Sequence, residues 1–258
     1  MSIQTFRAFL IGPTPWRPRS PWHPILAVLA TIGIVVAGQI VPAVVLGMLS
    51  GGPVQTQPGD PGAPDAMFEM IEGVGASVLI LGQVSLAVLT LAAAGLFGAR
   101  SVDVLSLERP EGGGRSYAFA LLVMLPVIAV INAAAFALSP SGFKADFDQF
   151  AKLAHIAEPL AAFLAIAVGA PLWEEMLFRG FLLGPLVGPL GFWPAAVLVS
   201  GTWTALHIGY SIAGLSEVFL IGIYFSWLLR RTGSLWVPIA CHGLYNAALF
   251  AIIRYWPL

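Results

Sequence analysis

The sequence predicts an all-α, polytopic membrane protein built as a bundle of about seven (six to eight) transmembrane helices. Two observations support this fold class. Of the 258 residues, 58% are hydrophobic and only 10% are charged, whereas about 25% of the residues in a soluble globular domain are charged. The hydrophobic residues also gather in runs that can cross a bilayer, which takes roughly 20 mostly apolar residues per helix.

Each predicted span is a hydrophobic run bounded by polar or Pro/Gly-rich segments. Between the third and fourth runs, residues 139–159 have an amphipathic pattern that predicts a short interfacial helix. The links after this segment are short, so we expect a compact C-terminal bundle behind a loosely connected N-terminal half. The predicted spans are 25–49, 74–98, 117–138, 159–184, 192–210, 212–229 and 235–254.

These features divide the chain into three parts. Residues 1–24 form an N-terminal segment without the regions of a cleavable signal peptide, so we expect the first span to act as an uncleaved anchor. Residues 25–116 hold the N-terminal helices and their loops. Residues 117–254 hold the other predicted spans. We expect a catalytic cavity within these C-terminal helices, because ionisable residues occur inside their spans.

The distribution of Lys and Arg predicts the orientation. Cytoplasmic loops carry an excess of these residues, and residues 50–73 contain none. A cytoplasmic N-terminus, with cytoplasmic loops at 99–116 and 230–234, fits best, although Lys144 and Lys152 then lie outside. We expect a multi-pass integral membrane protein, in the inner membrane if the source is bacterial. The supporting arginines are Arg7, Arg17, Arg19, Arg100, Arg109, Arg115, Arg230 and Arg231.

Two adjacent glutamates stand inside the fourth predicted span, in the stretch PLWEEMLFRG. An ionisable side chain at the centre of a span costs about 2.5–3.5 kcal/mol, which makes it a functional candidate by default. Glu175 and Arg179 are four residues apart and share a helix face, which predicts an ion pair. Glu174 points about 100° away, so it can face a cavity and act as a general base.

Two later spans carry histidines in polar motifs of one helical turn. In GTWTALHIG, His207 follows Trp203 by one turn, so the indole would stack on the imidazole and shield it from solvent. In ACHGLYNAALF, His242 and Asn246 lie on one face. Such a pair can donate two hydrogen bonds to one oxygen, as a developing oxyanion requires.

Each of these residues also has a structural interpretation. The charges could lie at the end of a span and extend toward the headgroups, and His or Asn side chains could bridge membrane helices. Two acids, two histidines and an amide on three late spans nevertheless favour a catalytic set. Cys241 is expected to be a small buried hydrophobe. A net charge of −1 gives no indication of a nucleic-acid partner.

Taken together, the motifs resemble those of the CPBP family of intramembrane proteases, which includes the eukaryotic Ras-converting CAAX endopeptidase and many bacterial Abi proteins. The resemblance covers about residues 117–254, and Trp203 stands where the family usually has phenylalanine. The matching residues are Glu174, Glu175 and Arg179 for EExxxR, His207 for FxxxH, and His242 with Asn246 for HxxxN.

The resemblance implies an intramembrane endopeptidase whose cavity opens from the cytoplasmic leaflet. Its substrate would be a membrane-associated protein or peptide, including one that is C-terminally lipidated at a CAAX-like end. The implied roles are water activation by Glu174 with His207, oxyanion stabilisation by His242 and Asn246, and support of Glu174 by Glu175 and Arg179.

Two mechanisms are equally compatible with these residues. Glu174, His207 and His242 form a candidate set of zinc ligands with an open fourth position, as in a metalloprotease. There is no HExxH motif, and a metal-independent, glutamate-dependent mechanism would use the same side chains.

The depth of His207 fits less well. At 1.5 Å per residue, Glu174 and His242 lie about 10–15 Å from the cytoplasmic edges of their spans, whereas His207 lies nearer the outer end. Either residues 184–194 are re-entrant and the fifth span starts later, or the loop after that span dips into the membrane.

Two other function classes could use this scaffold. A non-enzymatic immunity or partner-binding protein has no physical need to keep Glu174, His207, His242 and Asn246 together. A proton-coupled transporter could use the acids and histidines as a relay, but the sequence shows no internal repeat of the kind found in many transporters. The intact motifs favour the enzyme.

Overall fold

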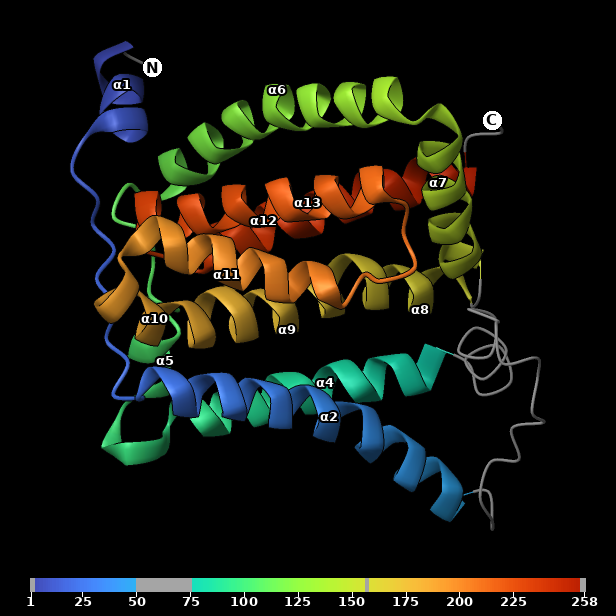
Figure 1. The fold of residues 1–258 in the computed structure, drawn as a ribbon, viewed down its shortest axis with the longest axis horizontal. Helices are drawn as coiled ribbons and strands as arrows, with labels where there is room; N and C mark the ends of the chain where they lie inside the picture. The colour runs from blue at the N-terminus through green and yellow to red at the C-terminus, as the bar shows by residue number, and fades with distance from the viewer. Residues whose placement is uncertain (1–2, 50–75, 156–157, 256–258) are drawn as a thin grey trace.

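The computed structural model describes residues 3–49, 76–155 and 158–255. These residues form an all-α bundle and contain no β-strand, only one isolated bridge. The all-α prediction is therefore confirmed (Figure 1). The predicted acidic loop at 50–73 lies outside the described residues.

Helices of the N-terminal half lie close to the predicted spans. Three long helices coincide with the first three spans to within a few residues, and the amphipathic segment 139–159 forms a helix across one end of the bundle (Figure 1). The elements are α1 (Ile3–Ile11), α2 (Pro24–Leu49), α4 (Ala76–Ala94), the 3-10 turn η1 (Leu96–Gly98), α5 (Ser101–Val104), α6 (Gly114–Leu138) and α7 (Pro140–His155).

The C-terminal half begins with one long helix over 159–190, interrupted by two π-helical segments, η2 and η3. Three further helices follow. The elements are α8 (Pro159–Phe163), η2 (Leu164–Gly169), α9 (Ala170–Glu174), η3 (Glu175–Leu182), α10 (Leu183–Leu190), α11 (Phe192–Ala205), α12 (Ile212–Thr232) and α13 (Trp236–Tyr255).

Within the described ranges, five helices are long and apolar enough to cross a membrane. A shorter apolar helix covers Val78–Ala94, and α11 has 14 residues, which is about 21 Å of helix. Five clear spans and two shorter helices therefore occupy the places of the predicted spans. The five are Pro24–Pro42, Gly114–Leu138, Pro159–Leu190, Ile212–Thr232 and Trp236–Tyr255.

Residues 184–194 are not re-entrant, so that sequence-based alternative is wrong. The prolines and glycines of this segment suggested a break, yet residues 183–190 continue the helix with Pro189 inside it. Apolar surroundings offer the backbone no water to bond, which favours helix even at such residues. The turn comes at Gly191, whose φ of 77° and ψ of 168° are accessible to glycine but not to other residues.

The predicted fifth span, 192–210, starts where expected but ends early, at Ala205. His207 therefore lies in the turn between α11 and α12 rather than inside a helix. The other explanation for its depth, that the loop after this span dips into the membrane, stays a prediction.

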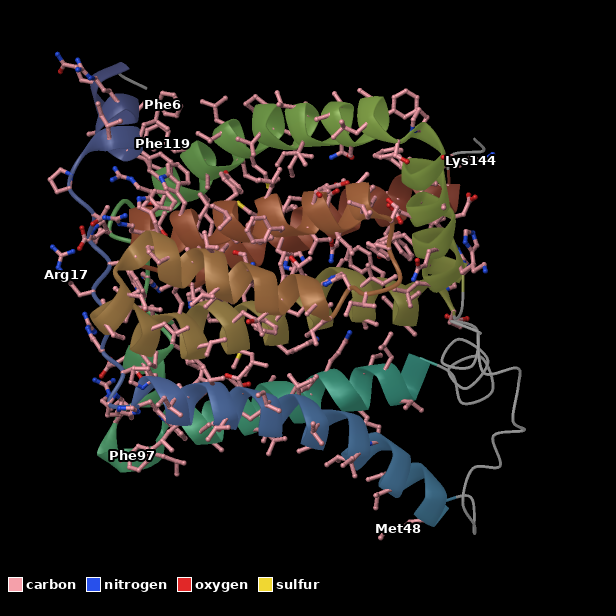
Figure 2. All side chains as sticks on the ribbon, in the orientation of Figure 1. Phe6, Arg17, Met48, Phe97, Phe119 and Lys144 are labelled. Carbon is pink, nitrogen blue, oxygen red and sulfur yellow. The ribbon has the colours of Figure 1, made fainter. Side chains whose placement is uncertain are left out.

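Three segments predicted to share the cytoplasmic side meet at one end of the bundle. The guanidinium of Arg231 donates to carbonyl oxygens at the end of α1, including those of Ala8 and Gly12. The loop at Ser106 accepts a 3.0 Å hydrogen bond from Trp16 Nε1 and a 2.8 Å bond from the backbone of Leu235. α7, with Lys144, covers the opposite end (Figure 2). The grouping agrees with the Lys/Arg prediction, while the identity of the cytoplasmic side stays a prediction.

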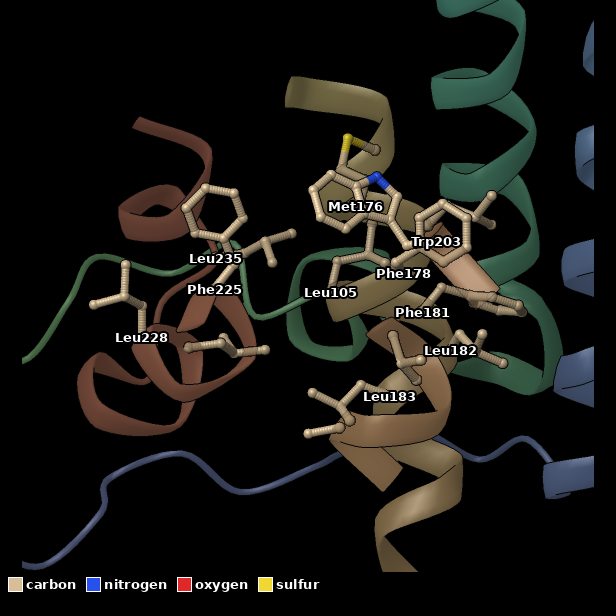
Figure 3. Close-up of a cluster of buried hydrophobic side chains, with 14 of the residues drawn as sticks. Leu105, Met176, Phe178, Phe181, Leu182, Leu183, Trp203, Phe225, Leu228 and Leu235 are labelled. Carbon is tan, nitrogen blue, oxygen red and sulfur yellow. The ribbon is translucent and has the colours of Figure 1, made fainter. Parts of the chain in front are cut away.

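The best-packed core lies between the long helix, α11 and α12 (Figure 3). Phe178, Phe181 and Phe225 are fully buried there, and Cys241 is buried as a free thiol, in agreement with its predicted place. By contrast, many large apolar side chains on the outside of the bundle are exposed, as expected for helices that face lipid.

α4 packs against the long helix of the C-terminal bundle. Gln83 of α4 donates from Nε2 to the carbonyl oxygen of Ala165 in η2, at 3.0 Å. Gly169 makes this approach possible, since a Cβ at that position would lie 2.0 Å from Gln83 Oε1. Gln83 thus adds a polar link between α4 and the long helix, besides the hydrogen bonds that join the two halves near Ser106.

Candidate active site

The two adjacent glutamates lie in the middle of the long helix, where α9 ends and η3 begins. Glu174 keeps 9% of its surface exposed, while Glu175 and Arg179 keep none. Because π-helical turns are frequent at functional sites, their position next to η3 is itself an indication of function. Glu174 is 16 residues from the end of the helix at Leu190, deeper than the sequence predicted.

Glu175 connects two helices. Its Oε1 lies 3.1 Å from Arg179 Nη1, the pair expected from the four-residue spacing. The same oxygen lies 2.9 Å from Nδ1 of His242 on α13. This contact between His242 and Glu175 was not predicted, because spacing along one helix carries no information about contacts between helices.

Glu174 is held by a different partner. Nε1 of Trp203, on α11, donates to Glu174 Oε2 at 2.6 Å, and both side chains are buried. No donor to Glu174 Oε1 is recorded among the described residues. The two glutamates thus have separate partners, as their angular separation predicted.

Trp203 stands at the centre of the site. The guanidinium carbon of Arg179 lies 4.3 Å from its ring centroid, in cation–π geometry. The rings of His207 and His242 approach it edge-on, at 5.1 Å and 5.7 Å between centroids. The predicted contact with His207 is present, but the rings are inclined by 73° rather than stacked.

Phe225 of α12 is a site residue that sequence reasoning missed. It stacks on His242 with ring centroids 5.0 Å apart and an interplanar angle of 27°. It also lies 5.8 Å from the guanidinium of Arg179. Nothing distinguishes this phenylalanine along the chain from the 15 others among the 16 in the sequence.

His207 has a defined orientation in the turn after α11. Its Nδ1 lies 3.0 Å from the carbonyl oxygen of Trp203. A carbonyl only accepts hydrogen bonds, so Nδ1 carries the proton. In the neutral ring, Nε2 then keeps its lone pair and can accept a hydrogen bond from water.

Asn246 and His242 do not share an acceptor in this structure. Asn246 Nδ2 donates to the carbonyl oxygen of Ile166 in η2 at 2.9 Å, while His242 Nδ1 contacts Glu175. Asn246 therefore bridges two helices, as its structural interpretation allowed, and retains a second N–H. The oxyanion role stays a prediction.

The residues named as candidate zinc ligands do not form a metal site as placed. Across residues 3–49, 76–155 and 158–255, no three His, Cys, Asp or Glu side chains are grouped so that they could hold a metal ion. Nδ1 of each site histidine bonds a protein acceptor, which leaves Nε2 as the ring nitrogen available to water or to another ligand. No step proposed below passes through a metal.

Several buried polar atoms of the site have no protein partner within the described part of the chain. They are Glu175 Oε2, Arg179 Nε and Nη2, and Ser200 Oγ. A Cβ at Gly222 would lie 2.9 Å from both Arg179 Nη2 and Ser200 Oγ, so these two groups lie against the bare backbone of α12. Buried polar atoms are usually hydrogen bonded, which makes this the place to look for ordered water.

Tyr210 and its neighbours border the site at the end covered by α7. Burial raises the pKa of the Tyr210 hydroxyl to about 12, with additional contributions from the charges of Asp146, Glu174 and Glu217. The hydroxyl is therefore protonated at neutral pH. Asp146 of α7 accepts hydrogen bonds from the backbone and side chain of Ser211, each 2.6 Å long, and so fixes the turn that carries His207.

This arrangement defines a class of protein: a helical membrane bundle with a buried, polar site of glutamate, histidine and arginine. Residues 156–248 match the family model described as "Type II CAAX prenyl endopeptidase Rce1-like". All of the site residues predicted from the sequence fall in this segment. The predicted resemblance is confirmed for this segment, which is similar to the Rce1-like family of CAAX prenyl endopeptidases.

Two curated proteins are similar to part of the chain. An Escherichia coli protein named "Uncharacterized 24.3 kDa protein" is 33% identical over 90 residues, which cover 34% of this chain and 42% of that protein. A Bacillus subtilis (strain 168) protein named "Putative membrane peptidase YdiL" is 32% identical over 93 residues, 35% of this chain and 36% of that protein. The chain thus matches less than half the length of these relatives. No solved structure matches it significantly.

Proposed function

We propose that this protein is an intramembrane endopeptidase in which Glu174 activates water to hydrolyse a peptide bond. The observation that carries the proposal is a buried carboxylate with one oxygen bound to Trp203 and the other without a protein donor among the described residues. The match of residues 156–248 to a CAAX endopeptidase family supports the same reaction class.

The first step is attack of water on the substrate carbonyl. Glu174 Oε1 accepts a proton from the water as the water oxygen bonds to the carbonyl carbon. Nε2 of His207, which holds a lone pair, accepts a hydrogen bond from the same water and orients it. The product of this step is a tetrahedral intermediate with a negative oxygen.

The second step is stabilisation and collapse of that intermediate. Glu175 supports positive charge on the ring of His242, so that His242 Nε2–H can donate to the oxyanion, together with the remaining N–H of Asn246. The C–N bond then breaks, and the proton held by Glu174 passes to the leaving nitrogen. The products are a carboxylic acid and an amine, which together contain the peptide and one water.

The substrate is a membrane-associated protein or peptide cleaved near its C-terminus, including one that carries a lipid at a CAAX-like end. Apolar side chains cover the outside of the bundle, which suits a substrate that diffuses within the bilayer. The cavity is proposed to open toward the cytoplasmic leaflet.

The test uses purified protein in liposomes together with membrane-anchored peptides, with and without a C-terminal prenyl group. Wild-type protein should release a C-terminal fragment that mass spectrometry identifies. Glu174→Ala and His207→Ala should remove cleavage while the protein stays folded in detergent. Full activity without Glu174 would refute the proposal, and function preserved after replacement of all four catalytic residues would favour the immunity or partner-binding alternative.

Metal dependence is measured on the same samples. The proposed chemistry needs no bound metal, so activity should survive chelation, and metal analysis should show no stoichiometric zinc. Zinc that is lost together with activity would instead assign water activation to a metal held by Glu174, His207 and His242.

A further inference from the structure

The geometry points to Trp203 as the positioning residue that binds one oxygen of Glu174 and leaves the other, Oε1, as the oxygen that accepts the proton from water. This inference rests on the proposed function, because it concerns the carboxylate that accepts the proton. It goes beyond that function by assigning the reactive oxygen and the group that selects it.

The central contact is a short hydrogen bond between two helices. Trp203 Nε1 lies 2.6 Å from Glu174 Oε2, and the tryptophan is 3% exposed. An indole N–H only donates hydrogen bonds, so Oε2 must present a lone pair to it. A hydrogen-bonded oxygen is the less basic of the two, so Oε1, which has no protein donor among the described residues, is the oxygen that accepts the proton from water.

The ring that carries this N–H is itself fixed. The guanidinium carbon of Arg179 lies 4.3 Å from its ring centroid, and Arg179 Nη1 in turn lies 3.1 Å from Glu175 Oε1. His207 and His242 contact its edges. Rotation of the indole would break its contacts with Glu174, Arg179 and both histidines, so these four residues together set the direction of the N–H.

Phenylalanine could fill much of this space but has no donor. In Trp203→Phe the aromatic face remains for Arg179, while Glu174 Oε2 loses its hydrogen bond. The carboxylate could then rotate and present either oxygen. Because both side chains are buried, the loss should affect the orientation of the base more than the binding of substrate.

The first arm of the test is kinetic. Trp203→Phe should lower kcat about tenfold to hundredfold, as expected for the loss of one hydrogen bond to a charged catalytic group, with KM within about twofold. The matched control is Trp16→Phe, which removes another buried indole hydrogen bond, from Nε1 to Ser106 Oγ at 3.0 Å, far from the site. The control should keep the wild-type kcat.

The second arm is spectroscopic and does not depend on activity. In protein labelled with ¹⁵N-tryptophan, the indole signal that disappears in Trp203→Phe belongs to Trp203. A hydrogen bond to a carboxylate places this proton downfield, and Glu174→Ala should move it upfield while the other tryptophan signals stay in place. The same spectra show whether each variant is folded.

The outcomes separate this inference from the proposed function. A shifted indole signal with reduced kcat and unchanged KM supports the positioning role. The positioning role is overturned if the chemical shift of the Trp203 indole proton is unchanged in Glu174→Ala. It is also overturned if the Trp203→Phe protein has the wild-type kcat. If the wild-type protein hydrolyses nothing, the proposed function fails, and the indole signal alone decides whether Trp203 holds Glu174.

Discussion

The N-terminal helices α2 and α4 contain no charged residue, whereas the C-terminal bundle buries Glu174, Glu175 and Arg179. In α2 and α4, Thr31, Ser85 and Thr90 each donate to a carbonyl oxygen of their own helix, four residues earlier. In the C-terminal bundle, hydroxyls such as that of Ser226 do the same, but the buried glutamates also bond across helices, to Trp203 and to His242.

This difference shows which polar residues in a membrane protein indicate function. A hydroxyl that bonds its own helix adds little beyond what the helix already has. A buried charge needs partners from other elements, so the bundle must be built around it. The family match, limited to residues 156–248, falls on the half that has such groups.

The largest effect should come from Arg179→Ala. Arg179 and Glu175 are both fully buried, so removal of the arginine leaves the carboxylate with His242 as its remaining partner and should destabilise the protein by about 3–5 kcal/mol. Thermal unfolding in detergent measures this loss. Arg115→Ala, at an exposed position, is the control. An equal loss of stability in both variants would show that the buried site does not differ from the surface in this respect.

Gly222→Ala should have the next largest effect. The added Cβ would lie 2.9 Å from Arg179 Nη2 and from Ser200 Oγ, so both must move, at a cost of about 1–3 kcal/mol. Peptidase activity should fall because Arg179 supports Trp203. Gly201→Ala, in α11, meets nothing within 4 Å and serves as the control. Identical stability and activity of the two variants would show that α12 is not closely packed on the site.

Gln83→Leu tests the junction of the two regions and should have the smallest effect. It removes the hydrogen bond to the carbonyl oxygen of Ala165, which is worth about 1 kcal/mol. Ser85→Ala, which removes a bond within α4, is the control and should be nearly neutral. Thermal unfolding distinguishes them, and a neutral Gln83→Leu would mean that the N-terminal helices do not depend on this contact.

Much of the fold could be predicted from the sequence because each helix depends on local hydrophobicity. The bounds of α2, α6, α12 and α13 agree with the predicted spans to within about three residues. The segment 184–194 misled the prediction, because Gly and Pro break helices in water but not reliably in apolar surroundings. The hydropathy of the sequence also did not predict that α11 ends at Ala205.

The site was predictable only as far as contacts within one helix. The spacing of Glu175 and Arg179 indicated their ion pair. The contact of Glu175 with His242 and the packing of Phe225 depend on how helices far apart in the sequence meet. The hydrogen bond from Trp203 had one available signal: tryptophan has an N–H donor, and a buried donor needs an acceptor.

The most direct test of the central claim is hydrolysis in H₂¹⁸O by the wild-type protein and by Glu174→Gln. Glutamine keeps the size of the side chain but cannot accept the proton from water. Wild-type protein should place one ¹⁸O atom in the new C-terminal carboxylate, and Glu174→Gln should form product at least about a hundredfold more slowly. Unlabelled product, or an undiminished rate in Glu174→Gln, would contradict water activation by Glu174.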